Sequence, residues 1–288
     1  MANDIVYLNG GFLPVGEARI SVLDRGFLFG DGVYEVIPVY GGRPFRLEHH
    51  LHRLDLSLQG IRLANPLGHD SWSAILTELV AHNGGGDLSL YLQVTRGVAP
   101  SRDHAFPHDV QPTVFAMTSP ITTPPDSVRA GITAVTVEDI RWQHCNIKAI
   151  TLLPNVLMRQ QAIDAGAAEA ILIRNGTATE GAASNLFIVR ACEVVTPPNS
   201  NLLLPGITRD LVVELCRTHS IPCSERDISE EELRSADEVW ITSSTKEVVP
   251  VIRLDGAIVS DGRPGTLWHR VAKLYSEYKQ AFREGHVD

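Results

Sequence analysis

Residues 141–162 read RWQHCNIKAITLLPNVLMRQQA and place Lys148 between Ile147 and Ala149. The stretch is typical of a protein interior, where a lysine is rarely fully buried. Burial lowers the pKa of a lysine because the ammonium loses its hydration, and the neutral amine that results is a nucleophile. Lys148 is therefore a candidate for Schiff-base chemistry. The alternative is a lysine at the edge of a helix whose amine extends into water.

The composition of the whole chain is that of an ordinary globular protein. Its 288 residues are 44% hydrophobic and 20% charged, enough for one large or two medium domains with a substantial core. The formal net charge of −9 argues against a nucleic-acid partner, whose phosphates need a basic surface. A small anionic ligand is still compatible, since it needs only a local cluster of cations.

The cysteines and the N-terminal residues indicate a cytoplasmic protein. The four cysteines form no CxxC pair and no metal-ligand spacing, so we expect reduced thiols. The first twelve residues, MANDIVYLNGGF, lack the charged and apolar regions of an export signal. No run approaches the roughly 18 consecutive apolar residues of a membrane span, so we expect no membrane partner.

Residues 1–118 predict a small domain of strands with two helices. Residues 4–22 and 32–47 alternate apolar and polar side chains around Asn9-Gly10-Gly11 and Gly41-Gly42, which indicates two hairpins. Leucines at helical spacing predict helices in the segments 47–63 and 71–84. Further strands are predicted in the segments 88–97 and 112–120.

The region after residue 118 predicts a linker and a second domain. Residues 119–130 are rich in proline and lack periodicity, so they are expected to connect the domains. Residues 131–288 alternate apolar strand patterns with helical ones. The helices are predicted from about Leu153 to Ala165 and within 208–220 and 265–282. The simplest fold class that agrees with these strands and helices is α+β, with two domains.

Three short motifs of the second domain carry polar groups that suit a flat, anionic ligand. Glu180 precedes Gly181 and two alanines, so little bulk would keep a ligand from the backbone, although such a residue is more often in a solvated turn. Gly206-Ile207-Thr208 precedes a helix, whose free N–H groups suit phosphate; Thr208 could also be the N-cap. Ser243 and Ser244 follow an apolar strand and offer further donors.

Six segments together resemble the fold-type IV pyridoxal-phosphate enzymes, the class IV aminotransferases. The resemblance spans nearly the whole chain, in order and at compatible spacing. It implies a smaller N-terminal α/β domain, a larger C-terminal barrel-like domain and pyridoxal 5′-phosphate at their interface. The segments are LDRGFLFGDGVYEVI (23–37), HLHRLDLSL (50–58), NIKAITLLPNVL (146–157), TEGAASNLFIV (179–189), LPGITRDLV (204–212) and ITSSTKEVVPV (241–251).

The resemblance also implies a role for each candidate cofactor residue. Lys148 would bind pyridoxal phosphate as a Schiff base and shuttle the proton during transamination. Glu180 would face the pyridine nitrogen and keep it protonated, so that the ring accepts electrons from the substrate. The phosphate would be bound by residues that carry N–H or hydroxyl donors. These are Arg53, Ile207, Thr208, Ser243 and Ser244.

The loop at 91–107, YLQVTRGVAPSRDHAFP, contains the residues that indicate the substrate. Arg102 and His104 resemble the arginine-x-histidine pair with which D-amino-acid aminotransferases bind the substrate α-carboxylate, together with the tyrosine matched by Tyr34. In an extended segment, side chains two positions apart point to the same side and can converge on one carboxylate. The resemblance further implies a homodimer in which Arg102 and His104 reach the partner's active site.

Two positions depart from the pattern of D-amino-acid aminotransferases. The loop between Gly97 and Arg102 is one residue longer than expected, which affects where Arg102 and His104 lie and therefore the substrate assignment. Ala183 stands where these enzymes commonly carry a serine that touches the cofactor.

The predicted function is transamination between D-amino acids resembling D-alanine or D-glutamate and 2-oxo acids such as 2-oxoglutarate, by a ping-pong mechanism. The nearest alternative is a branched-chain L-amino-acid aminotransferase, followed by an (R)-amine transaminase or an aminodeoxychorismate lyase. A non-catalytic pyridoxal-phosphate binder is the alternative outside enzymes. His49, His50 and His52 lack the separated partners of a metal site, so no metal is expected.

Overall fold

The computed structural model describes residues 4–121 and 126–287, which belong to two compact units. The first unit comprises residues up to Ile121, the short segment Ile147–Leu152 and the chain from Phe282 onward. The second comprises residues 126–146 and Leu153–Ala281. The proposed domain limits at residues 118 and 131 stay a prediction, and residues 122–125 of the predicted linker lie outside the described part.

The first unit is built on an antiparallel sheet in which the strands follow the order β2-β1-β6-β5-β3-β4. Asn9 and Gly10 connect β1 to β2, and Gly41 and Gly42 connect β3 to β4, so both predicted hairpins are confirmed. The strands are β1 (Ile5–Leu8), β2 (Gly11–Pro14), β3 (Gly32–Tyr40), β4 (Arg43–Pro44), β5 (Leu88–Thr95) and β6 (Thr113–Pro120).

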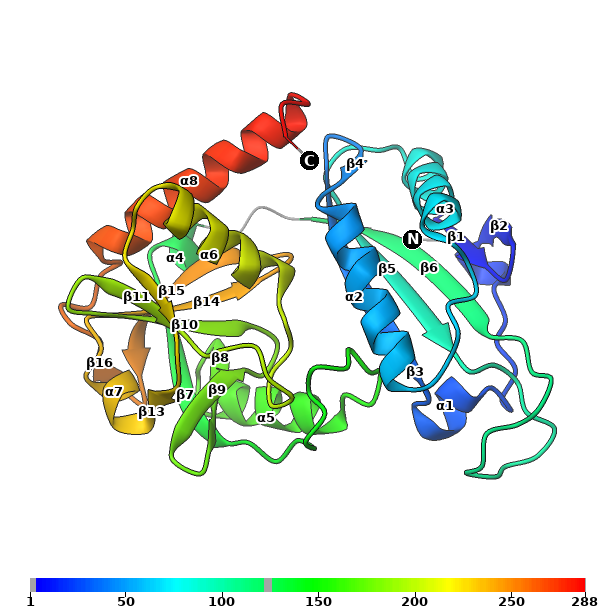
Figure 1. The fold of residues 1–288 in the computed structure, drawn as a ribbon, viewed down its shortest axis with the longest axis horizontal. Coiled ribbons are helices and arrows are strands. Elements are labelled where there is room, and N and C mark those ends of the chain that lie inside the picture. The colour runs from blue at the N-terminus through cyan, green and yellow to red at the C-terminus, as the bar shows by residue number, and fades with distance from the viewer. Residues whose placement is uncertain (1–3, 122–125, 288) are drawn as a thin grey trace. The chain divides into compact units, whose positions relative to one another are not determined.

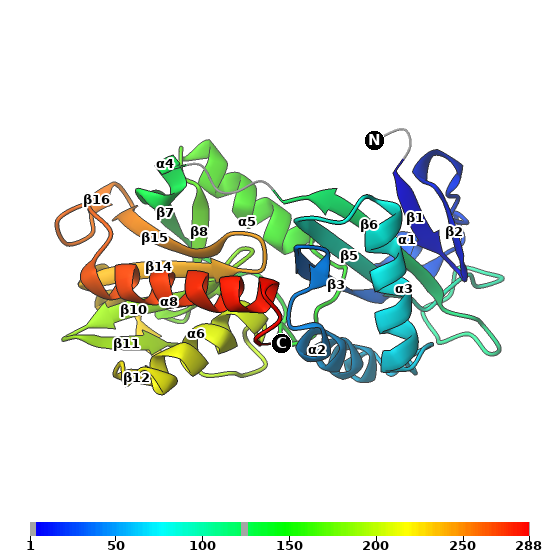
Figure 2. The same ribbon diagram turned by 90° about the horizontal axis from the view of Figure 1, so that it is seen from above.

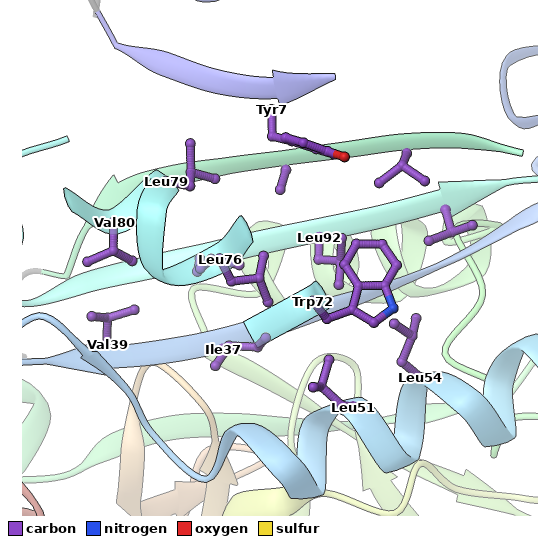
Figure 3. Packing of buried hydrophobic residues seen from close by; sticks show 14 of the residues in the cluster. Tyr7, Ile37, Val39, Leu51, Leu54, Trp72, Leu76, Leu79, Val80 and Leu92 are labelled. Atoms are coloured by element: carbon purple, nitrogen blue, oxygen red, sulfur yellow. The ribbon is translucent and has the colours of Figure 1, made fainter. Parts of the chain in front are cut away.

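Two long helices cover one face of this sheet (Figure 1). They are α2 (Leu47–Gly60) and α3 (His69–His82), and both agree with the predicted helical segments. Their buried leucines, such as Leu51 and Leu54, pack with Trp72 against Ile37 of β3 and Leu92 of β5 (Figure 3). A 3-10 turn, Val15–Glu17, and a short helix, α1 (Arg25–Phe29), precede β3.

The second unit is built on a long curled sheet (Figure 2), whose strands follow the order β12-β11-β10-β14-β15-β7-β8-β9-β13, with β16 beside β15. Buried residues from nearly every strand, for example Ala134, Ile188 and Ile241, share one apolar core. The strands are β7 (Ile132–Glu138), β8 (Glu169–Arg174), β9 (Thr177–Gly181), β10 (Asn185–Arg190), β11 (Glu193–Thr196), β12 (Cys223–Glu225), β13 (Ile228–Ser229), β14 (Glu238–Ser243), β15 (Glu247–Leu254) and β16 (Ala257–Ile258).

Helices pack on the outside of this curled sheet. Met158 and Ala162 of one helix contact Ala170 and Leu172 of β8. The helices are α4 (Asp126–Arg129), α5 (Leu153–Asp164), α6 (Ile207–Thr218), α7 (Glu230–Arg234) and α8 (Thr266–Arg283). The predicted α+β class is confirmed. Within the described residues, no helix is long and apolar enough to cross a bilayer.

Candidate active site

Lys148 is fastened to the edge of β3 by backbone hydrogen bonds. Its carbonyl oxygen accepts from the N–H of Tyr34 at 2.9 Å, and Ile150 N–H donates to the Gly32 carbonyl at 3.1 Å. The segment thereby lies along the first half of β3, while β4 pairs with its far end. The Lys148 Nζ lies 4.1 Å from the centroid of the Tyr34 ring. The structure thus brings two of the predicted residues into direct contact.

The prediction that the segment around Lys148 lies in the protein interior is wrong. Lys148 is half-buried, and Leu153 and Val156, the apolar residues that follow, are 68% and 59% exposed. These side chains start α5 and only Met158 and Ala162 of that helix are buried. The apolar residues of this segment therefore form an exposed face of α5 as well as a buried one.

Arg53 of α2 is buried and paired with Glu35 of β3. Its Nε and Nη2 atoms donate to the two Glu35 oxygens at 2.8 and 2.7 Å, a bidentate pair that fixes the plane of the guanidinium. His50 Nδ1 lies 2.7 Å from the same carboxylate. Burial would raise the pKa of Glu35, but Arg53 and His50 outweigh it and bring the pKa to about 2.

The Glu35 cluster lies close to Lys148. Burial is the main cause that lowers the pKa of His50, and the nearby positive charges of Arg53 and Lys148 lower it further. Sequence reasoning missed Glu35. The available signal was an acidic residue on the same face of β3 as the core residues Val33 and Ile37.

Arg102 and His104 lie together on the exposed loop between β5 and β6, and both contact Phe29 of α1. The Arg102 guanidinium carbon is 4.8 Å from the Phe29 ring centroid, and the two ring centroids of His104 and Phe29 are 5.2 Å apart. Phe29 is therefore a shared platform for the predicted carboxylate-binding pair. Sequence reasoning missed it.

Glu180 is fully buried on β9 rather than in a solvated turn. Arg141 donates to one of its oxygens, Asn185 Nδ2 donates to the other at 3.2 Å, and the Leu204 N–H points at both at 3.2 Å. Burial nevertheless raises the pKa of Glu180 to about 7. The carboxylate therefore has donors but too little positive charge to stabilise it fully.

The reason is that Arg141 is shared with a second carboxylate, Asp139. Arg141 Nε and Nη2 donate to the two Asp139 oxygens at 2.8 and 2.9 Å, and Arg174 pairs with the same group at 3.1 Å. Asp139 also repels the charge on Glu180. A cationic ring nitrogen at Glu180 would supply the missing positive charge. Neither Asp139 nor Arg141 was predicted from the sequence; both follow β7 within three residues.

The start of α6 lies beside the same cluster. Gly206 is the N-cap, so the prediction that Thr208 could be the N-cap is wrong; Thr208 is buried in the first turn together with Ile207. A Cβ at Gly206 would lie 1.9 Å from Asn185 Oδ1, so the residue must be glycine for the helix start to approach Asn185. The first N–H groups of α6 can therefore face an anion near Glu180.

The serine segment follows the strand next to Asn185. Thr242 of β14 pairs with Asn185 of β10 in the sheet register, and Ser243 and Ser244 come directly after it. Ser243 Oγ accepts from the Lys246 N–H at 3.3 Å. Thr242 Oγ1 is buried and has no hydrogen-bond partner among the residues that the structure describes. Buried hydroxyl groups without partners are expected where a polar ligand binds.

These donor sets fit the chemistry of pyridoxal phosphate. The first unit offers an amine beside a tyrosine ring and a buried arginine. The second offers an under-compensated carboxylate for the ring nitrogen, and a helix start and hydroxyl groups for the phosphate. No group of three or more His, Cys, Asp or Glu side chains that could hold a metal occurs in residues 4–121 and 126–287.

Comparison with known proteins agrees with this chemistry. The family model described as amino-transferase class IV matches residues 32–254. A D-alanine aminotransferase from Bacillus licheniformis is 42% identical over 266 residues, covering 92% of this chain and 94% of that protein. One from Staphylococcus haemolyticus is 38% identical over 274 residues, with 95% and 97% covered.

Solved structures of similar fold include branched-chain enzymes. The branched-chain amino acid aminotransferase of Escherichia coli matches with a TM-score of 0.90 at 26% identity, covering 96% of this chain and 94% of that chain. The branched-chain amino acid aminotransferase of the archaeon Thermoproteus uzoniensis, solved with norvaline, matches with a TM-score of 0.87 at 28% identity, covering 99% and 96%. These matches confirm the expected fold-type IV architecture.

Proposed function

This chain belongs to the class IV aminotransferases, and we propose that it transfers amino groups between D-amino acids and 2-oxo acids. It is an aminotransferase, and its cofactor is pyridoxal phosphate. The observation that carries the D-specific assignment is the convergence of Arg102 and His104 on Phe29, which lets one cation and one imidazole face a single carboxylate. D-alanine or D-glutamate would be the donors and 2-oxoglutarate an acceptor.

The relatives support the same choice. The two D-alanine aminotransferases are 42% and 38% identical to this chain over nearly their whole length, whereas the two branched-chain enzymes of similar fold are 26% and 28% identical. The branched-chain reading is therefore the second candidate. An amine transaminase acts on substrates without an α-carboxylate, so it would leave Arg102 and His104 without a role.

The cofactor, when bound, supplies an electron-accepting ring that stabilises negative charge on the substrate Cα. We assign the proton transfer to the Lys148 Nζ, which would also bind the cofactor covalently. The Tyr34 ring, whose centroid is 4.1 Å from this atom, is the neighbouring surface against which the amine lies.

Glu180 holds a proton at the ring nitrogen in this proposal. Asn185, Arg141 and the Leu204 N–H hold its carboxylate in one orientation. The negative charge of Glu180 would favour the protonated form of that nitrogen, and the nitrogen would supply the positive charge that Arg141, shared with Asp139, does not fully provide. Ala183 is exposed, and we assign it no role.

For the phosphate, we propose that the residues predicted from the sequence supply the donors. Ile207 and Thr208 present backbone N–H groups at the start of α6, and Thr208 adds its hydroxyl group. Ser243, Ser244 and Arg53 complete the set.

We also propose that the protein is a homodimer located in the cytoplasm. An exposed apolar patch surrounds α1, and we call it the α1 patch: Val22, Leu23, Phe27 and Val98, which are 41–72% exposed. The Asp24–Val98 bridge brings the two parts of the patch together. Exposed apolar patches of this kind mark protein interfaces. The patch adjoins the loop that carries Arg102 and His104.

The proposed function is tested by a panel of D- and L-amino acids, with the absorbance of the bound cofactor as the first readout. D-alanine and D-glutamate should convert the cofactor to its pyridoxamine form far faster than their L-isomers, and 2-oxoglutarate should reverse the change. A protein that only binds the cofactor would keep its resting spectrum with every amino acid. Faster conversion by L-leucine or L-valine than by any D-amino acid would instead establish the branched-chain activity.

A further inference from the structure

Arg25 of α1 holds the backbone of the loop that carries Arg102 and His104. Its Nη1 donates to the carbonyl oxygens of Asp103 at 2.6 Å and Ala105 at 3.2 Å. Its Nη2 donates to the carbonyl oxygen of His104 at 3.3 Å. Three consecutive carbonyl groups therefore converge on one guanidinium, and Arg25 is only 3% exposed.

The short helix α1 provides both the anchor and the platform for this loop. Arg25 and Phe29 are four residues apart and so lie on the same face of the helix, and the Arg25 guanidinium carbon is 4.8 Å from the Phe29 ring centroid. Asp24 caps the helix and also accepts from Thr95 and Thr113 of the sheet, at 3.1 and 2.6 Å. The platform is therefore rigidly connected to β5 and β6.

Asp31 fixes the orientation of the Arg25 guanidinium. Its carboxylate accepts from Arg25 Nε at 2.8 Å and from Arg96 Nε and Nη2 at 2.8 and 3.1 Å. Arg96 in turn supports the far side of the loop, because the Phe106 ring centroid is 3.8 Å from its guanidinium carbon. The loop is thus held on both sides of the predicted pair, although its own side chains from residue 101 to 106 are exposed.

We propose that Arg25 is a positioning residue for the substrate carboxylate: it fixes the backbone of residues 103–105 so that Arg102 and His104 are presented together on Phe29. This inference rests on the proposed function. A lysine cannot replace Arg25, since a single ammonium lacks the planar fork that reaches several carbonyl groups and Asp31 at once. The expected consequence of losing the fork is weaker substrate binding with little change in the chemistry at Lys148.

The test is the variant Arg25→Lys in the cofactor-loaded enzyme. We expect KM for D-alanine to rise about 10-fold or more, with kcat changed by less than about 3-fold, because hydrogen bonds that orient the loop are lost while the cofactor residues are untouched. The resting absorbance of the cofactor should stay the same. Arg43→Lys is the matched control, since Arg43 also donates to a carbonyl group, that of Phe282, and stacks on its ring far from the loop.

A double variant separates positioning from general stability. If Arg25 acts through Arg102, then Arg25→Lys should change kcat/KM by less than about 2-fold when Arg102→Leu is already present. Equal fold losses in both backgrounds, or a loss of kcat at unchanged KM, would overturn the inference. If Arg25→Lys does not fold, Asp31→Asn tests the same contact with Arg25 in place. An unchanged KM in that variant would also overturn the inference.

Failure of the proposed function looks different in the same experiment. A wild-type enzyme that prefers L-amino acids removes the D-specific assignment and this inference with it. A wild-type enzyme that prefers D-amino acids, with Arg25→Lys indistinguishable from Arg43→Lys, removes the inference alone.

Discussion

At the scale of single residues, Lys148 carries the most direct prediction. Lys148→Ala should remove the absorbance of the covalently bound cofactor and leave at most a trace of transamination, because the covalent link and the proton shuttle are both lost. Lys273→Ala is the control, since that lysine is exposed and pairs with Glu277 on the surface of α8. Absorbance spectra and D-alanine assays of both variants decide the matter, and an active Lys148→Ala enzyme would refute the assignment.

Arg102→Leu tests the carboxylate-binding pair. It should lower kcat/KM for D-alanine by on the order of 10²-fold, corresponding to roughly 3 kcal/mol for a lost guanidinium–carboxylate pair. His104→Ala should have a smaller effect in the same direction, because a neutral ring offers one hydrogen bond and no full charge. Steady-state kinetics with D-alanine measures both. A harmless Arg102→Leu would leave the pair without a substrate role.

Glu180 predicts a pH dependence of stability in the protein stripped of cofactor. Its pKa is raised from 4.5 to about 7 by burial, so the folded state binds a proton more tightly than the unfolded state. Stability from this group is therefore full below about pH 4.5 and is lost as the pH rises through about 7, by roughly 3 kcal/mol at most.

Glu180→Gln should remove this dependence. Denaturant unfolding of the two stripped proteins should show the variant gaining stability relative to wild type as the pH rises from 4.5 to 7. With the cofactor bound, the difference should shrink, since the ring nitrogen supplies positive charge. A stability difference that is the same at every pH would mean that Glu180 is not under-compensated.

At the scale of elements, the start of α6 depends on the absence of a side chain at Gly206. Gly206→Ala would drive a Cβ against Asn185, whose amide also binds Glu180 and the Leu204 carbonyl group. We expect cofactor affinity to fall by about 10-fold or more, because both the helix start and Glu180 are displaced. Titration of the stripped enzyme with pyridoxal phosphate measures this.

Gly68→Ala is a closely matched control for that variant. Gly68 is also a helix N-cap in extended backbone, at the start of α3, but its Cβ would meet nothing within 4 Å. The control should therefore keep full cofactor affinity. Equal affinities for the two variants would show that α6 does not contribute to the phosphate site.

At the scale of the whole molecule, the α1 patch predicts the oligomeric state. Phe27, which is 72% exposed, would be buried in the proposed homodimer, so Phe27→Glu should raise the dimer dissociation constant by at least about 10-fold through the cost of burying a charge. Sedimentation at several concentrations measures it. Ile258→Glu, at an exposed apolar residue on β16, should leave the dimer intact.

The same variant connects assembly with activity. If Arg102 and His104 serve the partner's active site, dilution of Phe27→Glu should lower D-alanine turnover in parallel with dissociation. Full turnover by a monomer would rule out that exchange of residues between subunits.

Much of this protein follows from sequence patterns that act over short distances. The hairpins at Asn9-Gly10 and Gly41-Gly42, and the helices α2 and α3, were predictable because turn geometry and apolar periodicity are local properties. Lys148, Glu180 and Thr208 could be selected because their motifs retain a fixed order and spacing. The sequence alone thus determined the α+β class, the family resemblance and most of the candidate cofactor residues.

Tertiary structure decided which charges meet, because partners far apart in the chain are joined only by folding. Glu35 with Arg53, Arg141 with Asp139 and Glu180, and Arg25 with residues 103–105 are such sets. The pKa values and orientations of these groups depend on burial and on how the hydrogen bonds of one arginine are distributed among several acceptors. No local sequence pattern encodes how an arginine distributes its hydrogen bonds. The contact of Arg25 with the loop that carries Arg102 and His104 is therefore seen only in the folded chain.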